Sequence, residues 1–459
     1  MYVGDTIVAS ATAPGTGAVA IVRLSGPRTM EILQAIFTPA SPGAIEPRKL
    51  HLGDVIDPVT GAQIDRAMAV KMPAPASLTG EDVAEIQCHG GPYLVRRIVA
   101  IAVAAGARMA EPGEFSRRAF LNGRIDLAEA EAIADLIEAR GESALKQALA
   151  QLSGALSERV GRLREQVIAI AAHLEADIDF SDEDIRLPSR RETASAIERL
   201  LADVTLLHSS FARGRLMREG VRAAIAGPPN AGKSSVLNLL IGADRAIVTP
   251  IAGTTRDVIE ESTAIGPHTM VLNDTAGIRE SNDEVERIGI ERTRRAAAQA
   301  DLLIAVFDGS RALEAADDET IRILEGRPGI AILNKRDLLP VTTACHLRGR
   351  GIAMPIIALS AIDPADAEPL RAELERAIEA MTGAPPADEA TISRERHRAA
   401  LERAASALKH ARESALALMP PEIVAVDIAS ASDALGQITG AVSGEDILDA
   451  IFRDFCIGK

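Results

Sequence analysis

The centre of this 459-residue chain contains the stretch Val221-Arg-Ala-Ala-Ile-Ala-Gly227-Pro-Pro-Asn-Ala-Gly232-Lys233-Ser234, which indicates the fold class of this region. Its apolar start predicts a buried strand, and a helical pattern begins at Lys233. The segment between them matches a phosphate loop, in which backbone N–H groups and a helix N-terminus hold phosphates. The next apolar runs along the chain alternate with helical segments. We therefore expect a Ras-like P-loop α/β domain with a parallel sheet that binds a nucleotide.

The phosphate loop predicts a role for most of its side chains. We expect Lys233 to contact the β- and γ-phosphates and Ser234 to bind Mg²⁺. Backbone groups and neighbouring side chains complete the predicted contacts, which come from Asn230, Ala231, Gly232 and Ser235.

Two further elements follow in the order that is typical of nucleotide-hydrolysing domains. Asp274-Thr-Ala-Gly277 comes after an apolar run, so Asp274 can hold Mg²⁺ through water and the Gly277 N–H can reach the γ-phosphate. Gly253-Thr-Thr-Arg-Asp257 precedes it, where a switch segment belongs, and Thr255 is the expected second hydroxyl ligand of Mg²⁺. Ile278 stands where many GTPases have a water-orienting glutamine, so hydrolysis needs another device.

Asn334-Lys335-Arg-Asp337 follows the apolar run Ile330 to Leu333 and predicts guanine specificity. The Asp337 carboxylate can accept hydrogen bonds from N1–H and the exocyclic amine of guanine, and adenine lacks both donors. Ser360-Ala361, at the end of a later apolar run, fits a backbone contact to guanine O6. The order of all these elements predicts a GTP-hydrolysing enzyme.

Length and composition limit what surrounds this domain. A chain of 459 residues suggests about three domains. Hydrophobic residues make up 47% and aromatic residues 2%, which favours helix-rich cores of Ala, Leu, Ile and Val. The net charge of −15 argues against a protein that coats nucleic acid through the electrostatic attraction of its overall charge. The sequence has neither a signal-peptide pattern nor a membrane-spanning run, so we expect a cytoplasmic protein.

The pattern along the chain predicts how the domains are arranged. Short apolar runs, helical stretches and turns alternate at the front and predict an α+β domain. From Leu145 to Leu174 a helical period predicts one long amphipathic helix, and Ile197 to Phe211 predicts another. Helical periodicity returns after the linker Thr382 to Glu389. The acidic stretch Asp177 to Asp184 is interpreted as a solvated connection.

These patterns predict the boundaries 1–122, 123–216, 217–382 and 383–459. We expect the second and fourth segments to be two halves of one all-helical domain, into which the α/β domain is inserted. The alternative is two separate helical bundles.

Cys88, Cys345 and Cys456 are far apart in the sequence, which fits neither a disulfide framework nor a zinc site. We expect free thiols. Cys88 lies beside His89, so a Cys-His nucleophile is an alternative, although the sequence reveals no third orienting group.

Motifs outside the α/β domain extend the pattern to both ends of the chain. They are Asp5-Thr-Ile-Val-Ala, Ile21-Val-Arg-Leu-Ser-Gly26, Thr79-Gly-Glu-Asp-Val83, His89-Gly-Gly91, Arg118-Ala-Phe-Leu-Asn-Gly123, Asp126-Leu, Ala130-Glu-Ala, Ile438-Thr-Gly440 and Cys456-Ile-Gly-Lys459. With the nucleotide motifs, they resemble the MnmE (TrmE) family of tRNA uridine-34 modification GTPases over essentially the full length.

The resemblance implies a three-part protein and an activity. The parts would be an N-terminal tetrahydrofolate-binding and dimerisation domain, a discontinuous helical domain and an inserted G domain. A homodimer would work with the flavoprotein MnmG in a heterotetramer, with tRNA as substrate and no membrane. GTP hydrolysis would be coupled to installing a (carboxymethyl)aminomethyl group at C5 of wobble uridine 34. The one-carbon donor would be 5,10-methylene-tetrahydrofolate, with 5-formyl-tetrahydrofolate as an analogue.

The resemblance also implies how hydrolysis proceeds without a glutamine. The G domains of the dimer would meet in the GTP-bound state, and K⁺ would perform the task of an arginine finger, since neutral oxygens can replace its water shell. The implied K⁺ ligands are Asn230, Thr249, Ile251 and Thr254, and Thr249 also belongs to the nucleotide-binding set. The implied catalytic set is Glu286, Lys233, Gly253 and Thr254.

For folate, the resemblance points to Arg23, Glu85, Arg124 and Lys459. A basic side chain can pair with the glutamate tail of folate, and a carboxylate can pair with the pterin edge. The chain departs from the family pattern twice, because Thr16 stands where a basic residue is common and Arg124 replaces a lysine.

Two other functions remain as alternatives from the sequence. One is a ribosome-assembly GTPase similar to Era, although Era-type proteins append an RNA-binding module and here only amphipathic helices follow. The other is a stand-alone folate one-carbon transferase with a regulatory G domain.

Overall fold

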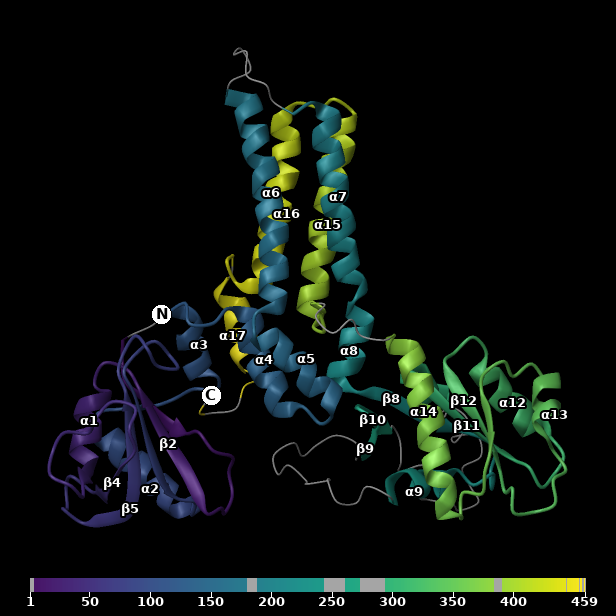
Figure 1. The fold of residues 1–459 in the computed structure, drawn as a ribbon, viewed down its shortest axis with the longest axis horizontal. Helices are drawn as coiled ribbons and strands as arrows, with labels where there is room; N and C mark the ends of the chain where they lie inside the picture. The colour runs from purple at the N-terminus through teal and green to yellow at the C-terminus, as the bar shows by residue number, and fades with distance from the viewer. Residues whose placement is uncertain are drawn as a thin grey trace. The chain divides into compact units, whose positions relative to one another are not determined.

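The computed structural model describes residues 4–179, 188–242, 261–272, 294–383, 390–442, 444–453, 455 and 458. The chain divides into two compact units. Unit 1 comprises Met1–Ala134, Val160–Arg164 and Ser432–Lys459, and unit 2 comprises Asp135–Arg159 and Glu165–Ala431. Figure 1 shows the fold and labels most of its helices and strands.

Unit 1 contains a mostly antiparallel sheet of seven strands. The strands are β1 (Ile7–Ser10), β2 (Val19–Ser25), β3 (Phe37–Pro39), β4 (His51–Ile56), β5 (Gln63–Met72), β6 (Val83–His89) and β7 (Arg108–Met109). Their order is β3-β4-β5-β6-β2-β1-β7, and only the β1–β7 pair is parallel. Side chains alternate across a strand, so each face of this sheet can bury its own layer.

Helices cover both faces of this sheet. They are α1 (Thr29–Ile36), α2 (Pro92–Ala104) and α3 (Glu114–Leu121). On one face, Val8 of β1 is buried with Ile32 of α1 and Ile98 of α2. On the other face, its neighbour Ile7 is buried with Phe115 of α3. The alternation along β1 therefore places α3 opposite α1 and α2.

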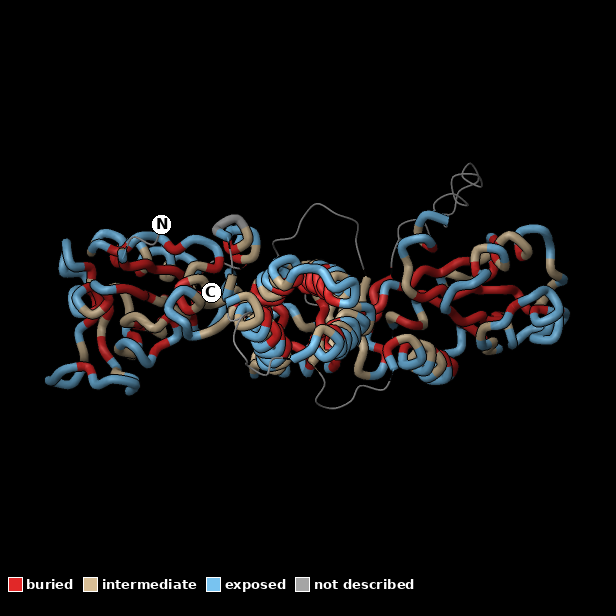
Figure 2. Tube along the Cα trace, turned by 90° about the horizontal axis from the view of Figure 1, so that it is seen from above, coloured by how far each residue is buried: buried red, intermediate tan, exposed pale blue. Residues whose placement is uncertain are grey.

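Unit 2 contains a six-stranded sheet in the order β13-β12-β11-β8-β10-β9. The strands are β8 (Val221–Ala226), β9 (Glu261–Ile265), β10 (His268–Leu272), β11 (Leu302–Asp308), β12 (Gly329–Asn334) and β13 (Ile356–Ala358). Its helices are α9 (Lys233–Gly242), α12 (Ala315–Leu324), α13 (Ala344–Gly349) and α14 (Ala367–Thr382), with a short 3₁₀ turn at Pro364–Asp366. Helices α9 and α14 pack on one face, and α12 and α13 pack on the other. Figure 2 shows the strands as buried segments.

The sheet of unit 2 confirms the predicted α/β fold class and corrects one detail of it. Strands β8, β10, β11, β12 and β13 are parallel to one another, but the edge strand β9 pairs antiparallel with β10. The sequence predicted a parallel sheet, and β9 was not among the predicted strands. Its sequence Glu261-Ser-Thr-Ala-Ile265 has no apolar run, because an edge strand need not be buried on both faces.

The remaining helices form the helical part of the chain. They are α4 (Leu127–Glu138), α5 (Glu142–Leu152), α6 (Ala155–Asp179), α7 (Arg190–Ser209), α8 (Phe211–Glu219), α15 (Glu395–Leu416), α16 (Pro421–Thr439) and α17 (Glu445–Arg453). Within unit 2, α7 packs along α15, although the whole α/β sheet separates them in the sequence. Among the described residues, no helix is long and apolar enough to cross a membrane.

The predicted single helix from Leu145 to Leu174 is wrong, because α5 ends at Leu152 and α6 begins at Ala155. Gly154 between them has φ +90°, a conformation that glycine adopts readily and other residues do not. Leucines at regular spacing do not report such a break. Leu145 and Leu149 are also exposed, and the buried face of α5 consists of Ser143, Ala144, Gln147, Ala148 and Gln151.

Candidate GTP-binding site and folate-site residues

The phosphate loop connects the end of β8 to the start of α9. Asn230 and Gly232 have φ +59° and +97°, so the loop bends sharply before the helix begins. The Lys233 ammonium donates to the carbonyls of Gly227 and Pro228, both at 2.9 Å. Burial lowers the pKa of Lys233 below its ordinary value. The loop thus carries a partly desolvated positive charge, which suits a phosphate ligand.

One buried side chain joins the phosphate loop to the loop after β13. Asn334, 3% exposed, donates from Nδ2 to the Ala231 carbonyl at 2.8 Å. Its Oδ1 accepts from the Ala361 N–H at 2.9 Å. A Cβ atom at Gly232 would lie 2.1 Å from Asn334 Nδ2, so this position requires glycine. Asn334 was predicted to bind nucleotide, and in the structure it links two loops of the site.

The predicted guanine-recognition residues lie together at the carboxyl ends of the strands. An oxygen of the Asp337 carboxylate accepts from the Ser360 hydroxyl at 2.5 Å. The Ser360 N–H donates to Asp366 at 2.7 Å, and Arg336 donates to both oxygens of Asp366 at 2.9 and 3.1 Å. The loops that contain Asp337 and Ser360 are therefore hydrogen-bonded to each other, and Asp366 supports both.

Lys335 contacts a carboxylate that the sequence analysis missed. It has φ +67°, and its ammonium donates to Asp308 at 2.6 Å. Burial would raise the pKa of Asp308, but hydrogen bonds from Lys335 and Ser310 outweigh burial and hold this pKa below its ordinary value. A signal was available, because Asp308 ends the strand beside β12 and neighbouring parallel strands end at the same edge.

Part of the predicted site falls outside the described residues. These positions are Thr249, Ile251, Gly253, Thr254, Thr255, Asp274, Gly277 and Glu286. Of the predicted Mg²⁺ and K⁺ ligands, Ser234 and Asn230 lie in the described part, and both are exposed at the phosphate loop. A hydroxyl and an amide oxygen are ligands that hard cations accept. Within the described ranges, no group of three or more His, Cys, Asp or Glu side chains could hold a metal ion.

Two of the predicted folate residues are cross-strand partners in unit 1. Arg23 of β2 pairs with Glu85 of β6, with Nε 2.8 Å from Oε1. The Arg23 guanidinium also donates to the Gly458 carbonyl at 3.3 Å and lies 5.7 Å from the centre of the Phe115 ring. The structure thus brings Arg23, Glu85 and a residue next to the chain's last position together.

The other two predicted folate residues are placed less closely. Arg124 is exposed, just after α3, and its Cγ would lie 3.3 Å from a Cβ atom at Gly80. Lys459 lies outside the described residues. The side chain of Arg124 therefore lies against the loop that leads into β6.

The contacts of Cys88 argue against the alternative of a Cys-His nucleophile. Its thiol is buried and contacts the Ala20 carbonyl at 3.5 Å. Burial, together with the charge of Asp65, raises the pKa of Cys88 to about 11, so the reactive thiolate is disfavoured. His89 is paired with Asp65 at 2.8 Å. Cys345 is free and exposed, as expected, and Cys456 lies outside the described residues.

Comparisons with known proteins agree along the whole chain. The model of the GTP-binding protein TrmE N-terminus matches residues 6–124, and that of the MnmE helical domain matches residues 127–456. The tRNA modification GTPase MnmE of Symbiobacterium thermophilum is 44% identical over 459 residues, 99% of each chain. The protein of the same name from Heliobacterium modesticaldum is 43% identical over 466 residues, 100% of each chain.

A solved structure of Aquifex aeolicus Era bound to GDP·AlF₄⁻ is 24% identical and covers 41% of this chain and 66% of that one. Its TM-score of 0.28 is too low to support a structural comparison. The two MnmE relatives, in contrast, match this chain over essentially its full length. Together with the two family models, they show that this chain belongs to the MnmE (TrmE) family of tRNA modification GTPases.

Proposed function

We propose that this GTP hydrolase of a tRNA-modifying family is activated by K⁺ and by dimerisation, and works with a folate one-carbon donor on wobble uridine 34. The proposal of GTP binding is supported by the hydrogen bonds of Asn334 and Asp337. These bonds join the phosphate loop, the predicted guanine loop and Ser360. A nucleotide bound there would contact the phosphate-binding and base-binding loops, which these hydrogen bonds connect to each other.

Guanine recognition is assigned to the Asp337 carboxylate. It would accept from N1–H and the exocyclic amine of guanine, and adenine would leave it unpaired. Asp337→Asn should weaken GTP binding and favour xanthosine triphosphate, whose 2-position oxygen needs a donor. Competition binding with the two nucleotides measures this change, and an unchanged preference for GTP would refute the assignment.

Potassium is proposed because GTP hydrolysis needs positive charge to stabilise the transition state. The chain also lacks a water-orienting glutamine after its Asp-Thr-Ala-Gly motif, where Ile278 stands. Asn230 supports this role, since its amide is exposed at the bend of the phosphate loop. K⁺ is well served by neutral oxygens of this kind. Together with the switch-segment oxygens, Asn230 would hold K⁺ beside the phosphates, where the ion would supply positive charge.

GTP turnover should be measured in potassium and in sodium buffers across protein concentrations. We expect turnover to be faster in potassium and to rise with concentration. Equal, concentration-independent rates would sink the potassium-assembled dimer. Asn230→Ala should reduce the response to potassium more than it reduces GTP affinity.

A folate donor is proposed for unit 1. The carboxylate of Glu85 and the guanidinium of Arg23 are paired and mostly buried, with 16% and 19% of each side chain exposed. These two groups have the chemistry to bind a pterin edge and a glutamate tail. Calorimetric titration with 5-formyl-tetrahydrofolate tests the assignment, and wild-type affinity in Arg23→Ala and Glu85→Gln would contradict it.

The partners are proposed to be a second copy of this chain, the flavoprotein MnmG and tRNA, in the cytoplasm. The net charge of −15 favours an arrangement in which the partner supplies much of the tRNA-binding surface. One-carbon transfer to tRNA should require both MnmG and GTP hydrolysis. Transfer without either would favour the stand-alone transferase, and the full-length relatives already weaken the Era-like alternative.

The predicted domain boundaries also remain a proposal. The contact between α7 and α15 favours one helical domain interrupted by the G domain over two separate bundles, because these helices lie on opposite sides of the G domain in the sequence.

A further inference from the structure

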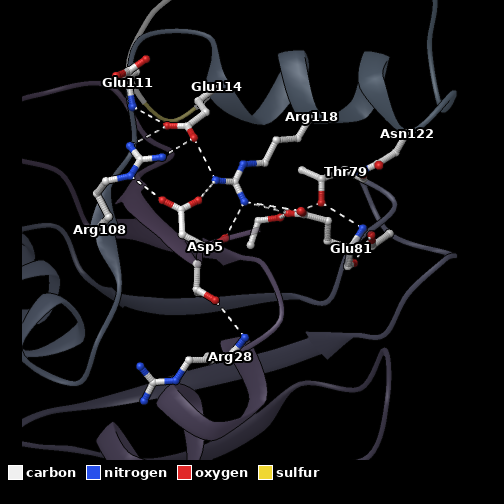
Figure 3. Close-up of polar contacts among 12 residues, drawn as sticks. Asp5, Arg28, Thr79, Glu81, Arg108, Glu111, Glu114, Arg118 and Asn122 are labelled. Atoms are coloured by element: carbon white, nitrogen blue, oxygen red, sulfur yellow. Dashed lines mark hydrogen bonds and ion pairs between the residues drawn. The ribbon is translucent and has the colours of Figure 1, made fainter. Parts of the chain in front are cut away.

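An arginine that no predicted function uses lies at the centre of unit 1. The side chain of Arg118, on α3, is 2% exposed and ranks among the largest fully buried side chains of the described residues. Figure 3 shows its guanidinium between three carboxylates. Nη2 lies 2.6 Å from Asp5 and 2.9 Å from Glu114, and Nη1 lies 3.2 Å from Glu81.

The carboxylates around Arg118 connect to further groups. Arg108 donates to both Asp5 and Glu114, each at 2.6 Å. The Ser25 hydroxyl donates to Glu81 at 2.7 Å and contacts the Thr79 hydroxyl at 2.7 Å. A buried guanidinium is tolerated only when its charge and its N–H groups are matched, and its planar fork fixes where the partners lie. We call these seven residues the Arg118 network: Asp5, Ser25, Thr79, Glu81, Arg108, Glu114 and Arg118.

Two members of the network lie at the ends of the strands that present predicted folate residues, one in β2 and one in the loop just before β6. Ser25 ends β2, two residues after Arg23. Glu81 lies in the loop before β6, four residues ahead of Glu85. The Gly26 N–H donates to the Asp82 carbonyl at 3.0 Å, so the ends of the two strands are joined beside the network.

Helix α3 connects the network to a third predicted folate residue, Arg124. The Phe115 ring, one turn before Arg118, lies against the Arg23 guanidinium. At the helix end, Asn122 donates from Nδ2 to the Thr79 carbonyl at 2.7 Å. Arg124 follows, and the short approach of its Cγ to Gly80 places it on the same loop. The position of α3 against this loop therefore determines where Arg124 lies.

From these contacts we infer that Arg118 is a positioning residue for the folate site: its fork fixes α3 and the Thr79–Asp82 loop against β2 and β6, and so sets the spacing of Arg23, Glu85 and Arg124. This inference rests on the proposed folate function. The Arg118 side chain is buried and need not touch the ligand.

The test measures the affinity of full-length variants for 5-formyl-tetrahydrofolate, together with the circular dichroism that the bound pterin acquires, which reports its orientation. Arg118→Lys keeps the charge and loses the fork. It should weaken folate binding about tenfold, by analogy with residues that orient metal ligands, whose loss costs about 10–100-fold in metal affinity. The induced signal should also change, and GTP turnover should stay at the wild-type level.

Two control variants separate positioning from general destabilisation. Val55→Ala removes buried atoms from β4, on the face of the sheet opposite α3, and lowers the melting temperature without touching the network. Arg97→Lys alters another ion pair of unit 1, with Asp57 at 2.6 Å. Both should bind folate as wild type does when affinity is measured well below each melting temperature. Weaker binding in Val55→Ala equal to that in Arg118→Lys would overturn the inference.

A second network variant covers the case in which Arg118→Lys does not fold. Glu81→Gln removes one of the three carboxylates and should weaken folate binding about threefold with little loss of stability, since burial raises the pKa of Glu81 and so disfavours its charged form. Wild-type affinity and wild-type induced signal in the network variants that fold would overturn the inference. Absence of folate binding by the wild-type chain, or wild-type binding by Arg23→Ala and Glu85→Gln, would instead refute the proposed function.

Discussion

Asn334 in unit 2 and Arg118 in unit 1 are both buried polar side chains that join segments far apart in the sequence. Asn334 is neutral, and two backbone groups, the Ala231 carbonyl and the Ala361 N–H, satisfy its amide. Arg118 is charged, and three carboxylates surround it. The neutral link needs only backbone that the fold already places there. The charged link depends on the ionisation of its partners, so the two units should respond differently to substitution and to pH.

The largest expected effect is on the charged link. Arg118→Met leaves three carboxylates without their buried cation and should lower the free energy of unfolding of unit 1 by about 3–5 kcal/mol. Differential scanning calorimetry of the full chain measures this loss. Part of it should return at acidic pH, where the carboxylates become neutral. A variant as stable as wild type at neutral pH would show that the network is not needed for folding.

Breaking the neutral link should lower GTP affinity as well as stability. Asn334→Ala leaves the Ala231 carbonyl and the Ala361 N–H without a partner, at about 1–3 kcal/mol each. The phosphate loop and the loop after β13 would no longer be joined, so we expect GTP to bind about 100-fold more weakly, since each tenfold step is about 1.4 kcal/mol. Titration with a GTP analogue checks the affinity, and folate affinity should not change.

The stability of unit 1 should depend on pH through the carboxylates around Arg118. Hydrogen bonding from Arg108 is the largest cause that lowers the pKa of Asp5 from 3.8, against burial, which raises it. A carboxylate with a lowered pKa stabilises the folded state above its ordinary pKa, and this contribution is lost as pH falls through the lowered value. Asp5→Asn should therefore flatten the loss of unit 1 stability below pH 3.8.

Glu81 should act in the opposite direction. Burial raises its pKa above 4.5, so its charged form costs stability at neutral pH, and this cost is relieved as pH falls through the raised value. Melting temperatures measured from pH 7 to pH 3 in wild type, Asp5→Asn and Glu81→Gln separate the two contributions. Identical profiles for all three proteins would contradict the charged-link description.

The smallest expected effect comes from removing an ion pair that lies shortly after strand β2. Arg28 and Glu31 pair at 2.7 Å, but both side chains are largely exposed. Exposed pairs contribute little, because water screens them and long side chains lose freedom. Arg28→Ala should leave the melting temperature within experimental error and folate affinity unchanged. A clear loss in either measurement would mean that surface charge, and not only the buried network, supports this part of unit 1.

Sequence motifs predicted the candidate nucleotide site in outline. Lys233, Asn334, Asp337 and Ser360 could be predicted because each belongs to a short motif that follows an apolar strand, and parallel strands end at one edge of a sheet. Local spacing carries that information. For the same reason the order of β8, α9 and the later strands was predicted correctly, whereas β9, which has no apolar run, was missed.

Which distant groups come into contact could not be predicted from the sequence, because it depends on how the chain folds. The break at Gly154 depends on a backbone angle that the leucine spacing does not report. The pairing of Lys335 with Asp308 and the enclosure of Arg118 by Asp5 and Glu81 depend on which strands are neighbours. In the sequence, a charged residue that is later buried looks the same as one on the surface. Its burial becomes favourable only when the fold brings partners of opposite charge around it.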